Sequence, residues 1–339
     1  MSLMLQEALD APNRLQEFLS KDEAVFQDLA KRLRTLDPAF VATVARGSSD
    51  HAATYAEYLF PLCTGKLVAS IPPSLLTVLK AKLQLKNQFV LALSQGGGSP
   101  DIVGSLENAR KAGALTAAIV NEVNSPLAKS TEVLLPQHAG QEKSITATKS
   151  VICTLAAIAR LAATWSEDQA LLTALKNLPG VLSQAARTGG EIDESLLKGV
   201  SHAYVLSRAL GLSAARELAL KFKETCGIHA EPFSAAEVRH GPREVVDKNF
   251  LVVALMLPGS GGEDVKSVAE ELKTQGARVL LVGPKKSRAD FVIPEAGDYR
   301  LDTLVALQFL YPWIARSAVA LGRNPDRPRT LQSKVIETT

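Results

Sequence analysis

The chain has 339 residues, of which 46% are hydrophobic and 22% charged, and its formal charge at pH 7 is +3. This balance is typical of a folded protein with one large domain or two of ordinary size, and not of a disordered chain. The small net charge, the lack of a Lys/Arg block and the 5% aromatic content argue against a nucleic-acid partner.

Cysteine, histidine and hydropathy patterns favour a cytoplasmic protein. Cys63, Cys153 and Cys226 have no paired spacing, as expected for reduced thiols. No His/Cys/Asp cluster has metal-ligand spacing, so neither a metal nor another cofactor is predicted. The most apolar stretch, 150–165, is too short to cross a bilayer and contains Arg160, and the N-terminus lacks a signal-peptide pattern. No membrane association is expected.

An N-terminal helical segment is predicted over 1–37, where apolar residues recur at helical spacing and the pattern stops at Pro38. Beyond it, short apolar runs alternate with helical patterns. Such runs suit strands buried on both faces of a parallel sheet that is flanked by helices. The first strands are expected at 40–45, 66–70, 88–94, 115–120 and 132–136.

A mostly helical connection is predicted over 141–187, followed by a second set of strands. These strands are expected at 202–207, 250–256, 278–283 and 290–294. The tail from Gly322 onward is polar and contains Pro325 and Pro328, so an irregular course over the surface is expected.

The two sets of strands are predicted to be two copies of one α/β unit. Three segments match in the same order, the first at an offset of 162 residues: 44–60 with 206–222, 89–98 with 250–262, and 111–121 with 274–284. Such a repeat indicates internal duplication. Each copy is predicted to be a doubly wound parallel sheet with three α/β/α layers, and to bind ligands beyond the carboxyl ends of its strands. The predicted domains are 38–180 and 181–322, followed by a tail over 323–339.

Glycine and serine follow two expected strands of the first copy. Residues 46–50 read RGSSD, and residues 94–101 read SQGGGSPD. Glycine lets the backbone approach an anion, serine hydroxyls donate to it, and the next helix presents free N–H groups. Either loop alone is also typical of an ordinary strand-to-helix turn, but together they predict a phosphate-binding cradle. The P-loop and dinucleotide fingerprints are absent.

A second cluster of polar residues lies in the second copy. Glu217, Lys221 and Glu224 fall on one face of an expected helix. The loop predicted over 227–242 then brings His240 onto a Gly-Pro corner. The residues alone leave two interpretations open, which are an exposed ion pair worth about 0.3–0.5 kcal/mol and an acid/base site.

Four stretches resemble sugar isomerase (SIS) domains: RGSS, LSQGGGSPD, QEKSITATKS (141–150) and ARELALKFKETCGIHAEPFSAAEVRHGP (215–242). They are most similar to the tandem SIS pair that forms the isomerase part of glutamine–fructose-6-phosphate transaminase, and to stand-alone SIS-type glucosamine-6-phosphate deaminases. The resemblance covers nearly the whole chain, including 4–15 at its start and 326–335 at its end.

The resemblance implies a set of positions that bind the sugar phosphate. They are Ser48, Ser49, Ser94, Gln95, Gly96, Ser99, Ala147 and Thr148. Gly96 replaces a family serine, although its backbone N–H still donates, and Ala147 stands where serine is common. Lys334, which matches the lysine that covers the sugar, lies one residue further from Pro-Arg than in the family.

The resemblance also implies catalytic roles. Glu224 matches the base that moves a proton between C2 and C1 of the sugar, while Glu217 and Lys221 match residues that orient the base and the sugar. His240 matches the residue that opens the sugar ring and comes from the partner subunit. A homodimer with shared active sites is therefore expected, with a phosphosugar as the small-molecule partner.

The second copy is predicted to be a degraded cradle. Residues 208–210 read Arg-Ala-Leu where residues 47–49 read Gly-Ser-Ser. The loop 227–242 is then expected to be free to reach outward to a partner.

The expected reaction converts glucosamine 6-phosphate into fructose 6-phosphate and ammonium, because the chain begins directly with the isomerase-like part and has no ammonia source of its own. Two alternatives stay open among enzymes, which are deaminases of other amino-sugar phosphates and fructosamine-6-phosphate deglycases. An alternative of another class is a non-catalytic sugar-phosphate sensor.

Overall fold

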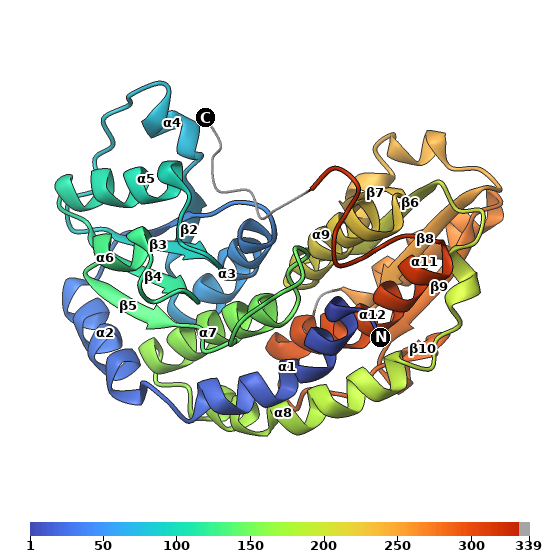
Figure 1. Ribbon diagram of the computed structural model, residues 1–339, viewed down its shortest axis with the longest axis horizontal. Coiled ribbons are helices and arrows are strands. Elements are labelled where there is room, and N and C mark those ends of the chain that lie inside the picture. Colours follow the sequence, from blue (N-terminus) through green and yellow to red (C-terminus); the bar gives the residue numbers. More distant parts are fainter. Residues whose placement is uncertain (260, 332–339) are drawn as a thin grey trace. The chain divides into compact units, whose positions relative to one another are not determined.

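The computed structural model describes residues 1–259 and 261–331 (Figure 1). Contacts divide the chain into two compact units. The N-terminal unit comprises Asn13–Gln141 and Lys149–Lys176, and the C-terminal unit comprises Met1–Pro12, Glu142–Thr148 and the described residues from Asn177 onward. Helices α1 (Leu3–Leu19) and α8 (Gln169–Gly189) each contribute residues to both units.

The sheet of the N-terminal unit has five parallel strands in the order β2-β1-β3-β4-β5. Its strands are β1 (Phe40–Val44), β2 (Leu67–Ser70), β3 (Phe89–Ser94), β4 (Leu115–Val120) and β5 (Val133–Pro136). The five strands predicted from apolar runs are therefore confirmed. Its further helices are α2 (Glu23–Leu36), α3 (Ser48–Thr64), α4 (Pro73–Thr77), α5 (Pro100–Lys111), α6 (Pro126–Ser130) and α7 (Lys149–Trp165).

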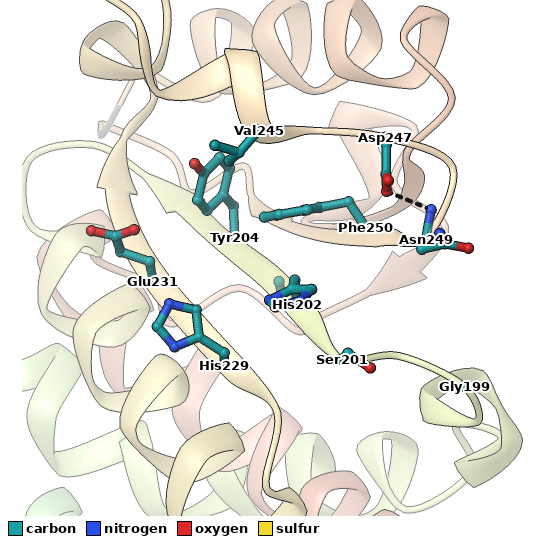
Figure 2. Close-up of a pocket in the computed structure, with 11 residues that line it drawn as sticks. Gly199, Ser201, His202, Tyr204, His229, Glu231, Val245, Asp247, Asn249 and Phe250 are labelled. Atoms are coloured by element: carbon teal, nitrogen blue, oxygen red, sulfur yellow. Dashed lines mark hydrogen bonds between the residues drawn. The ribbon is translucent and has the colours of Figure 1, made fainter.

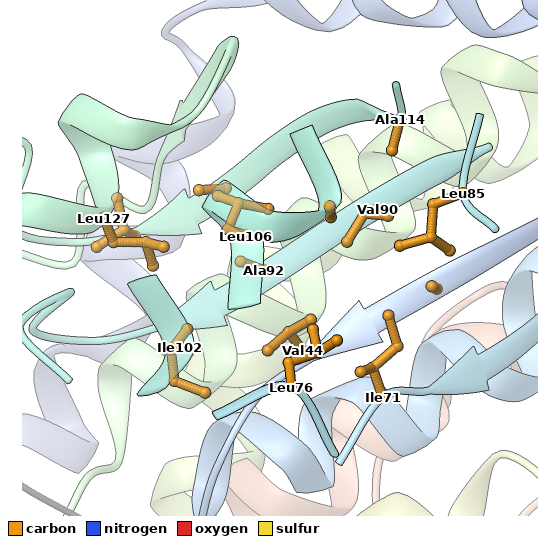
Figure 3. Packing of buried hydrophobic residues seen from close by; sticks show 14 residues of the cluster. Val44, Ile71, Leu76, Leu85, Val90, Ala92, Ile102, Leu106, Ala114 and Leu127 are labelled. Atoms are coloured by element: carbon orange, nitrogen blue, oxygen red, sulfur yellow. The ribbon is translucent and has the colours of Figure 1, made fainter. Parts of the chain in front are cut away.

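Helices cover both faces of this sheet. On one face, a cluster of buried side chains joins strand residues such as Val44 and Val90 to Ile102 and Leu106 of α5 (Figure 3). On the other face, α3 packs against α7. Arg160 is accommodated within the apolar helix α7 because its guanidinium donates to two backbone carbonyls and lies 4.5 Å from the centroid of a phenylalanine ring.

The sheet of the C-terminal unit has the order β10-β9-β8-β6-β7. Its strands are β6 (His202–Ser207), β7 (His229–Ser234), β8 (Phe250–Leu255), β9 (Arg278–Gly283) and β10 (Phe291–Val292). Numbered within each unit, both sheets have the order 2-1-3-4-5, which is a flavodoxin-like doubly wound arrangement. The shared order supports the internal duplication that the sequence predicts.

The C-terminal unit also contains the following helical elements. They are η1 (Glu194–Leu197), α9 (Gly211–Lys221), the π-helical turn η2 (Phe222–Cys226), α10 (Ala235–Val238), η3 (Pro242–Val245), α11 (Gly262–Thr274), η4 (Lys285–Ser287), η5 (Tyr299–Leu301) and α12 (Asp302–Ala320). No helix of the described residues is long and apolar enough to cross a membrane.

The expected free loop over 227–242 is wrong. Residues 229–234 form β7, which pairs in parallel with β6, and α10 follows directly. The strand is not a continuous apolar run, because it lies at the sheet edge, where polar side chains and Pro232 are tolerated. The internal repeat does indicate this strand. The strand predicted at 66–70 corresponds to residues 228–232 at the offset of 162, and these overlap β7.

A buried carboxyl group begins α12. The Asp302 side chain accepts a hydrogen bond from the Ala296 N–H at 3.3 Å, and the residue is 3% exposed. Burial raises the pKa of Asp302 to about 7, so the folded state holds this proton more tightly than the unfolded chain. The resulting stability is fully present below pH 3.8 and is lost as the pH rises through about 7.

Replacing this group should therefore change the pH dependence of folding. We expect Asp302→Asn, which keeps the acceptor oxygen, to be more stable than the wild type at pH 8 by about 1–4 kcal/mol. The difference should shrink toward pH 4. Urea unfolding of both proteins at several pH values measures it, and parallel stability curves would show that Asp302 titrates normally.

Candidate functional site

Six of the predicted phosphate-binding residues lie at the switch point of the N-terminal sheet. Strands β1 and β3 are neighbours in register, with Val44 opposite Ala92, and their connections run to opposite sides. Ligands of doubly wound sheets bind beyond the carboxyl ends of such strands. The residues that follow these two strand ends are Ser48, Ser49, Ser94, Gln95, Gly96 and Ser99.

The loop after β3 has a backbone that fixes its shape. Gly97 has φ +62, and a Cβ added there would lie 2.2 Å from Ser125 Oγ, so the position excludes other side chains. The Ser94 hydroxyl accepts the Gly97 N–H at 3.0 Å, and the Gly97 carbonyl accepts the Leu127 N–H at 3.0 Å. The loop is thus held in shape before any ligand arrives.

An ion pair joins the two loops. Arg46 follows β1, and its Nη2 lies 2.6 Å from Oδ2 of Asp101 in the first turn of α5. The Asp101 side chain is 4% exposed, whereas that of Arg46 is 47% exposed. Sequence reasoning missed this pair, although Arg46 and Asp101 both stand inside the two quoted loop motifs.

Side chains also meet at the equivalent strand ends of the C-terminal sheet, where Arg208 stands 162 residues after Arg46. Arg208 forms an ion pair with Asp264 at the first turn of α11 and passes close to Gly261. The Tyr299 ring lies so close to Gly259 that an added Cβ would come within 2.1 Å of it. The Arg208–Asp264 pair repeats the Arg46–Asp101 pair of the N-terminal unit, and the degraded cradle stays a prediction.

Glu217, Lys221 and Glu224 form one network in the C-terminal unit. Lys221 Nζ lies 3.1 Å from Glu217 Oε1 and 2.9 Å from Glu224 Oε2. The side chains of Lys221 and Glu217 are 1% exposed, while that of Glu224 is 22% exposed. This burial rules out the exposed surface pair that the sequence left open.

Glu224 stands on a π-helical turn. The α-helix α9 ends at Lys221, and η2 continues it to Cys226, where Gly227 closes the turn with φ 64. The wider turn keeps Phe222, Thr225 and Cys226 buried while Glu224 reaches the surface. Single π-helical turns are rare and frequently mark functional sites. No local pattern indicates this turn, since a regular helix also places the three charged residues on one face.

The two glutamates favour the charged form of Lys221. Burial disfavours the ammonium form of Lys221, but the two carboxylates outweigh it and raise the pKa of Lys221 above its usual range. The Tyr311 hydroxyl donates to Glu217 Oε1 at 3.4 Å, and burial followed by the charges of Glu217 and Glu142 raises the pKa of Tyr311. Glu224 Oε2 thus contacts a buried ammonium at 2.9 Å, while the Glu224 side chain is 22% exposed.

The predicted residues Ala147 and Thr148 belong to the segment Glu142–Thr148 of the C-terminal unit. Thr148 is fully buried, and its backbone N–H donates to Glu142 Oε1 at 2.9 Å. Its hydroxyl has no hydrogen-bond partner among the described residues. Glu142, which sequence reasoning did not select although it stands in the same motif, fixes the end of this segment.

His240 lies on an exposed turn after α10. Its corner is held in place because the Tyr204 hydroxyl donates to the Pro242 carbonyl at 2.8 Å, and Gly241 adopts φ 132. No contact among the described residues links His240 with Glu224. Lys334 lies outside the described residues.

A pocket of about 710 Å³ opens at the amino ends of β6, β7 and β8 (Figure 2). His202, His229, Glu231 and Phe250 line it, and Tyr204 forms part of its wall. It therefore lies at the edge of the sheet opposite to the crevice between β6 and β8, and none of the predicted site residues lines it.

Two doubly wound sheets of equal topology define a tandem α/β protein. Glycine- and serine-rich loops follow the switch-point strands of the first sheet, and a buried carboxylate–lysine network lies in the second unit. The SIS domain family profile matches residues 40–164 and 196–308. The chain therefore belongs to the SIS domain family.

Individual relatives agree with this assignment. The chain is 31% identical over 349 residues to the isomerizing glutamine–fructose-6-phosphate aminotransferase of Aquifex aeolicus, covering 98% of this chain and 57% of that protein. A Silicibacter pomeroyi structure, provisionally assigned as a phosphosugar isomerase, is 36% identical with a TM-score of 0.90, and the match covers 96% of this chain and 100% of that one. The glucosamine-6-phosphate deaminase of Thermotoga maritima is 25% identical with a TM-score of 0.80, covering 99% and 100%.

Proposed function

We propose that the chain is a phosphosugar aldose–ketose isomerase that converts glucosamine 6-phosphate into fructose 6-phosphate and ammonium. The observation that carries the proposal is Glu224, a carboxylate that emerges from a buried network with Lys221 and Glu217. The Thermotoga relative is named for glucosamine 6-phosphate and the Aquifex relative for fructose 6-phosphate, which supports the choice of substrate and product. The chain spans 57% of the length of the Aquifex relative, so the activity of that whole enzyme is not transferred to it.

The proposed chemistry needs one base and no redox step. The open-chain sugar loses its C2 proton to Glu224 and becomes an enolamine, and return of the proton to C1 gives the imine of fructose 6-phosphate. Water then adds to C2, and ammonium leaves. Lys221 holds Glu224 in place and offers positive charge close to the carbon atoms where negative charge develops. His240 is assigned the proton transfer that opens the sugar ring.

The proposed phosphate site is the crevice after β1 and β3. Serine hydroxyls and loop N–H groups there would bind the phosphate oxygens, and the first turns of α3 and α5 add their dipoles. Arg46 contributes a partly exposed cation at the same edge. The proposal requires that a phosphosugar bound there be presented to Glu224, either of the same chain or of a partner.

A substrate panel tests the proposal. Purified protein is incubated with the 6-phosphates of glucosamine, galactosamine, N-acetylglucosamine and fructosyl-lysine, and ammonium or free amine is measured. Ammonium release from glucosamine 6-phosphate is the expected result. Release from galactosamine 6-phosphate or of lysine from fructosyl-lysine 6-phosphate would assign one of the other enzymes. Tight binding without turnover of any of them would assign a sensor instead.

Removing one hydroxyl from the crevice should weaken phosphate binding. A hydroxyl bonded to a phosphate contributes about 1.5–3 kcal/mol, so Ser49→Ala is expected to weaken phosphosugar binding about 10- to 100-fold. Ser94→Ala should have at least this effect, because it also removes the acceptor of the Gly97 N–H. Calorimetry measures the affinity, and an unchanged value for both variants would place the phosphate elsewhere.

A homodimer with shared active sites remains part of the proposal. If Glu224 and His240 of one site come from different chains, co-expressed Glu224→Gln and His240→Ala chains form mixed dimers with one intact site and one doubly defective site. Activity should then return to about half per mixed dimer, as a symmetric dimer requires. Mass spectrometry verifies the mixing, and mixed dimers without activity would contradict the shared site. We also propose a cytoplasmic location for the enzyme.

A further inference from the structure

A short stretch after α12 contacts three separate segments of the C-terminal unit. We call residues Arg323–Asp326 the clamp segment. Its partners are the first turn of α1, the segment Glu142–Thr148, and the end of the π-helical turn η2. The last two carry Thr148 and Glu224, which the proposed function places at the substrate.

Asp326 forms hydrogen bonds with the first two partners, which are the first turn of α1 and the segment Glu142–Thr148. Its carboxylate accepts the N–H groups of Leu3 at 2.9 Å and Met4 at 2.8 Å, which lie at the positive end of α1. Its backbone carbonyl accepts the Ile145 N–H at 3.1 Å. One residue therefore connects the start of α1 to the middle of the Glu142–Thr148 segment.

Further hydrogen bonds attach the segment Glu142–Thr148 to its neighbours. The Thr146 hydroxyl donates to the Pro325 carbonyl at 2.6 Å. The carboxylate of Glu7 in α1 accepts the N–H groups of Lys143 and Ser144, and Glu7 is 6% exposed. The backbone that leads to Thr148 is thus bonded to α1 and to the clamp segment.

Arg323 contacts the third partner of the clamp segment, which is the end of η2. A Cβ added at Gly227 would lie 2.2 Å from Arg323 Cζ, so the guanidinium lies directly against the residue that ends η2. Burial raises the pKa of the Cys226 thiol to about 11, and the nearby charge of Arg323 opposes this rise. The clamp segment therefore contacts the turn of Glu224 three residues after that glutamate.

We propose that Asp326 and Arg323 are positioning residues, which hold the Glu142–Thr148 segment and the Glu224 turn in one fixed relation. The inference rests on the proposed function for its catalytic meaning, but the contacts can be tested without it. A misplacement of about 1 Å at a reacting group costs roughly 100-fold in rate. Loss of the clamp should therefore lower turnover without removing any group that touches the substrate.

The test compares Asp326→Ala with Asp326→Asn and with a control, Asp193→Ala. The Asn side chain keeps one acceptor oxygen. Asp193 also accepts a backbone N–H, that of Ser195 at the start of η1, but contacts none of the clamp partners. Asp326→Ala should lower kcat about 10- to 100-fold with KM within about threefold of wild type. Asp326→Asn should recover part of the rate, and the control should keep it.

Hydrogen exchange gives a readout that is independent of activity. In Asp326→Ala, amides in residues 1–8 and 142–148 should exchange faster than in the wild type, whereas the control should leave them unchanged. Unchanged exchange in both peptides would overturn the clamp, and faster exchange with an unchanged kcat would overturn its positioning role. If the wild type turns over no phosphosugar, the proposed function fails, while the exchange result still decides whether the clamp exists.

Arg323 is tested by a double-mutant cycle, which also covers the case that Asp326→Ala does not fold. Gly227→Ala alone meets both the positive φ and the guanidinium. In an Arg323→Ala background the same change meets only the backbone strain, so its effect on kcat should be smaller. Equal effects in the two backgrounds would overturn the contact.

Discussion

Glu224→Gln is expected to lower turnover about 10²- to 10⁴-fold with little change in KM, because the amide cannot accept the C2 proton. The substitution keeps the size of the side chain, and its oxygen still accepts the Lys221 ammonium at the position that Glu224 Oε2 now occupies. Steady-state kinetics on glucosamine 6-phosphate measure the effect. Glu231→Gln, which neutralises an exposed carboxylate on β7, is the matched control and should remain active.

Comparing the two variants distinguishes the loss of a catalytic base from the loss of a negative charge in the unit. If both lose the same activity, the loss reflects the charge of the unit and not proton transfer. If Glu224→Gln turns over at nearly the wild-type rate, the base is another group. Thermal unfolding of both variants verifies that the comparison concerns folded protein.

Lys221→Met is expected to destabilise the C-terminal unit by about 3–5 kcal/mol, because it leaves the buried carboxylate of Glu217 without its counter-charge. Glu217 is 0% exposed, so water cannot replace the lost ammonium as a source of compensating charge. Activity should fall as well, since Glu224 loses the cation that holds it. Urea unfolding followed by circular dichroism measures the loss.

A second variant shows that the loss comes from the unpaired charge. The double variant Lys221→Met/Glu217→Gln removes both buried charges, and replacing a buried ion pair by neutral groups is often neutral or stabilising. It should recover much of the stability while turnover stays low. A Lys221→Met protein as stable as the wild type would mean that the network is hydrated in solution and is not a buried ion pair.

The sequence was sufficient for the parts of the fold that follow from local pattern. Continuous apolar runs predicted β3 and β4, because these central strands are buried on both faces. β7 was missed because an edge strand such as HAEPFS has no such requirement. The repeat could have located it, since its counterpart β2 had been predicted.

In the candidate site, too, the features that follow from local spacing were predictable and those that depend on tertiary packing were not. The helical spacing of Glu217 and Lys221 predicted their proximity, but not that both side chains are only 1% exposed, because burial depends on distant elements such as α12. Tyr311 of that helix donates to Glu217 although 94 residues separate them. The π-helical turn below Glu224 likewise depends on tertiary packing around Phe222 and Cys226, which no local pattern encodes.

The contacts at the strand ends of the C-terminal sheet have a consequence for stoichiometry. Duplication of one unit would give two equivalent phosphate sites per chain, but in the second unit the Tyr299 ring lies against Gly259 and Arg208 pairs with Asp264. If the proposed phosphate site is confined to the N-terminal sheet, an assembly of n chains binds n phosphosugars and not 2n. The stoichiometry of a calorimetric titration distinguishes the two numbers.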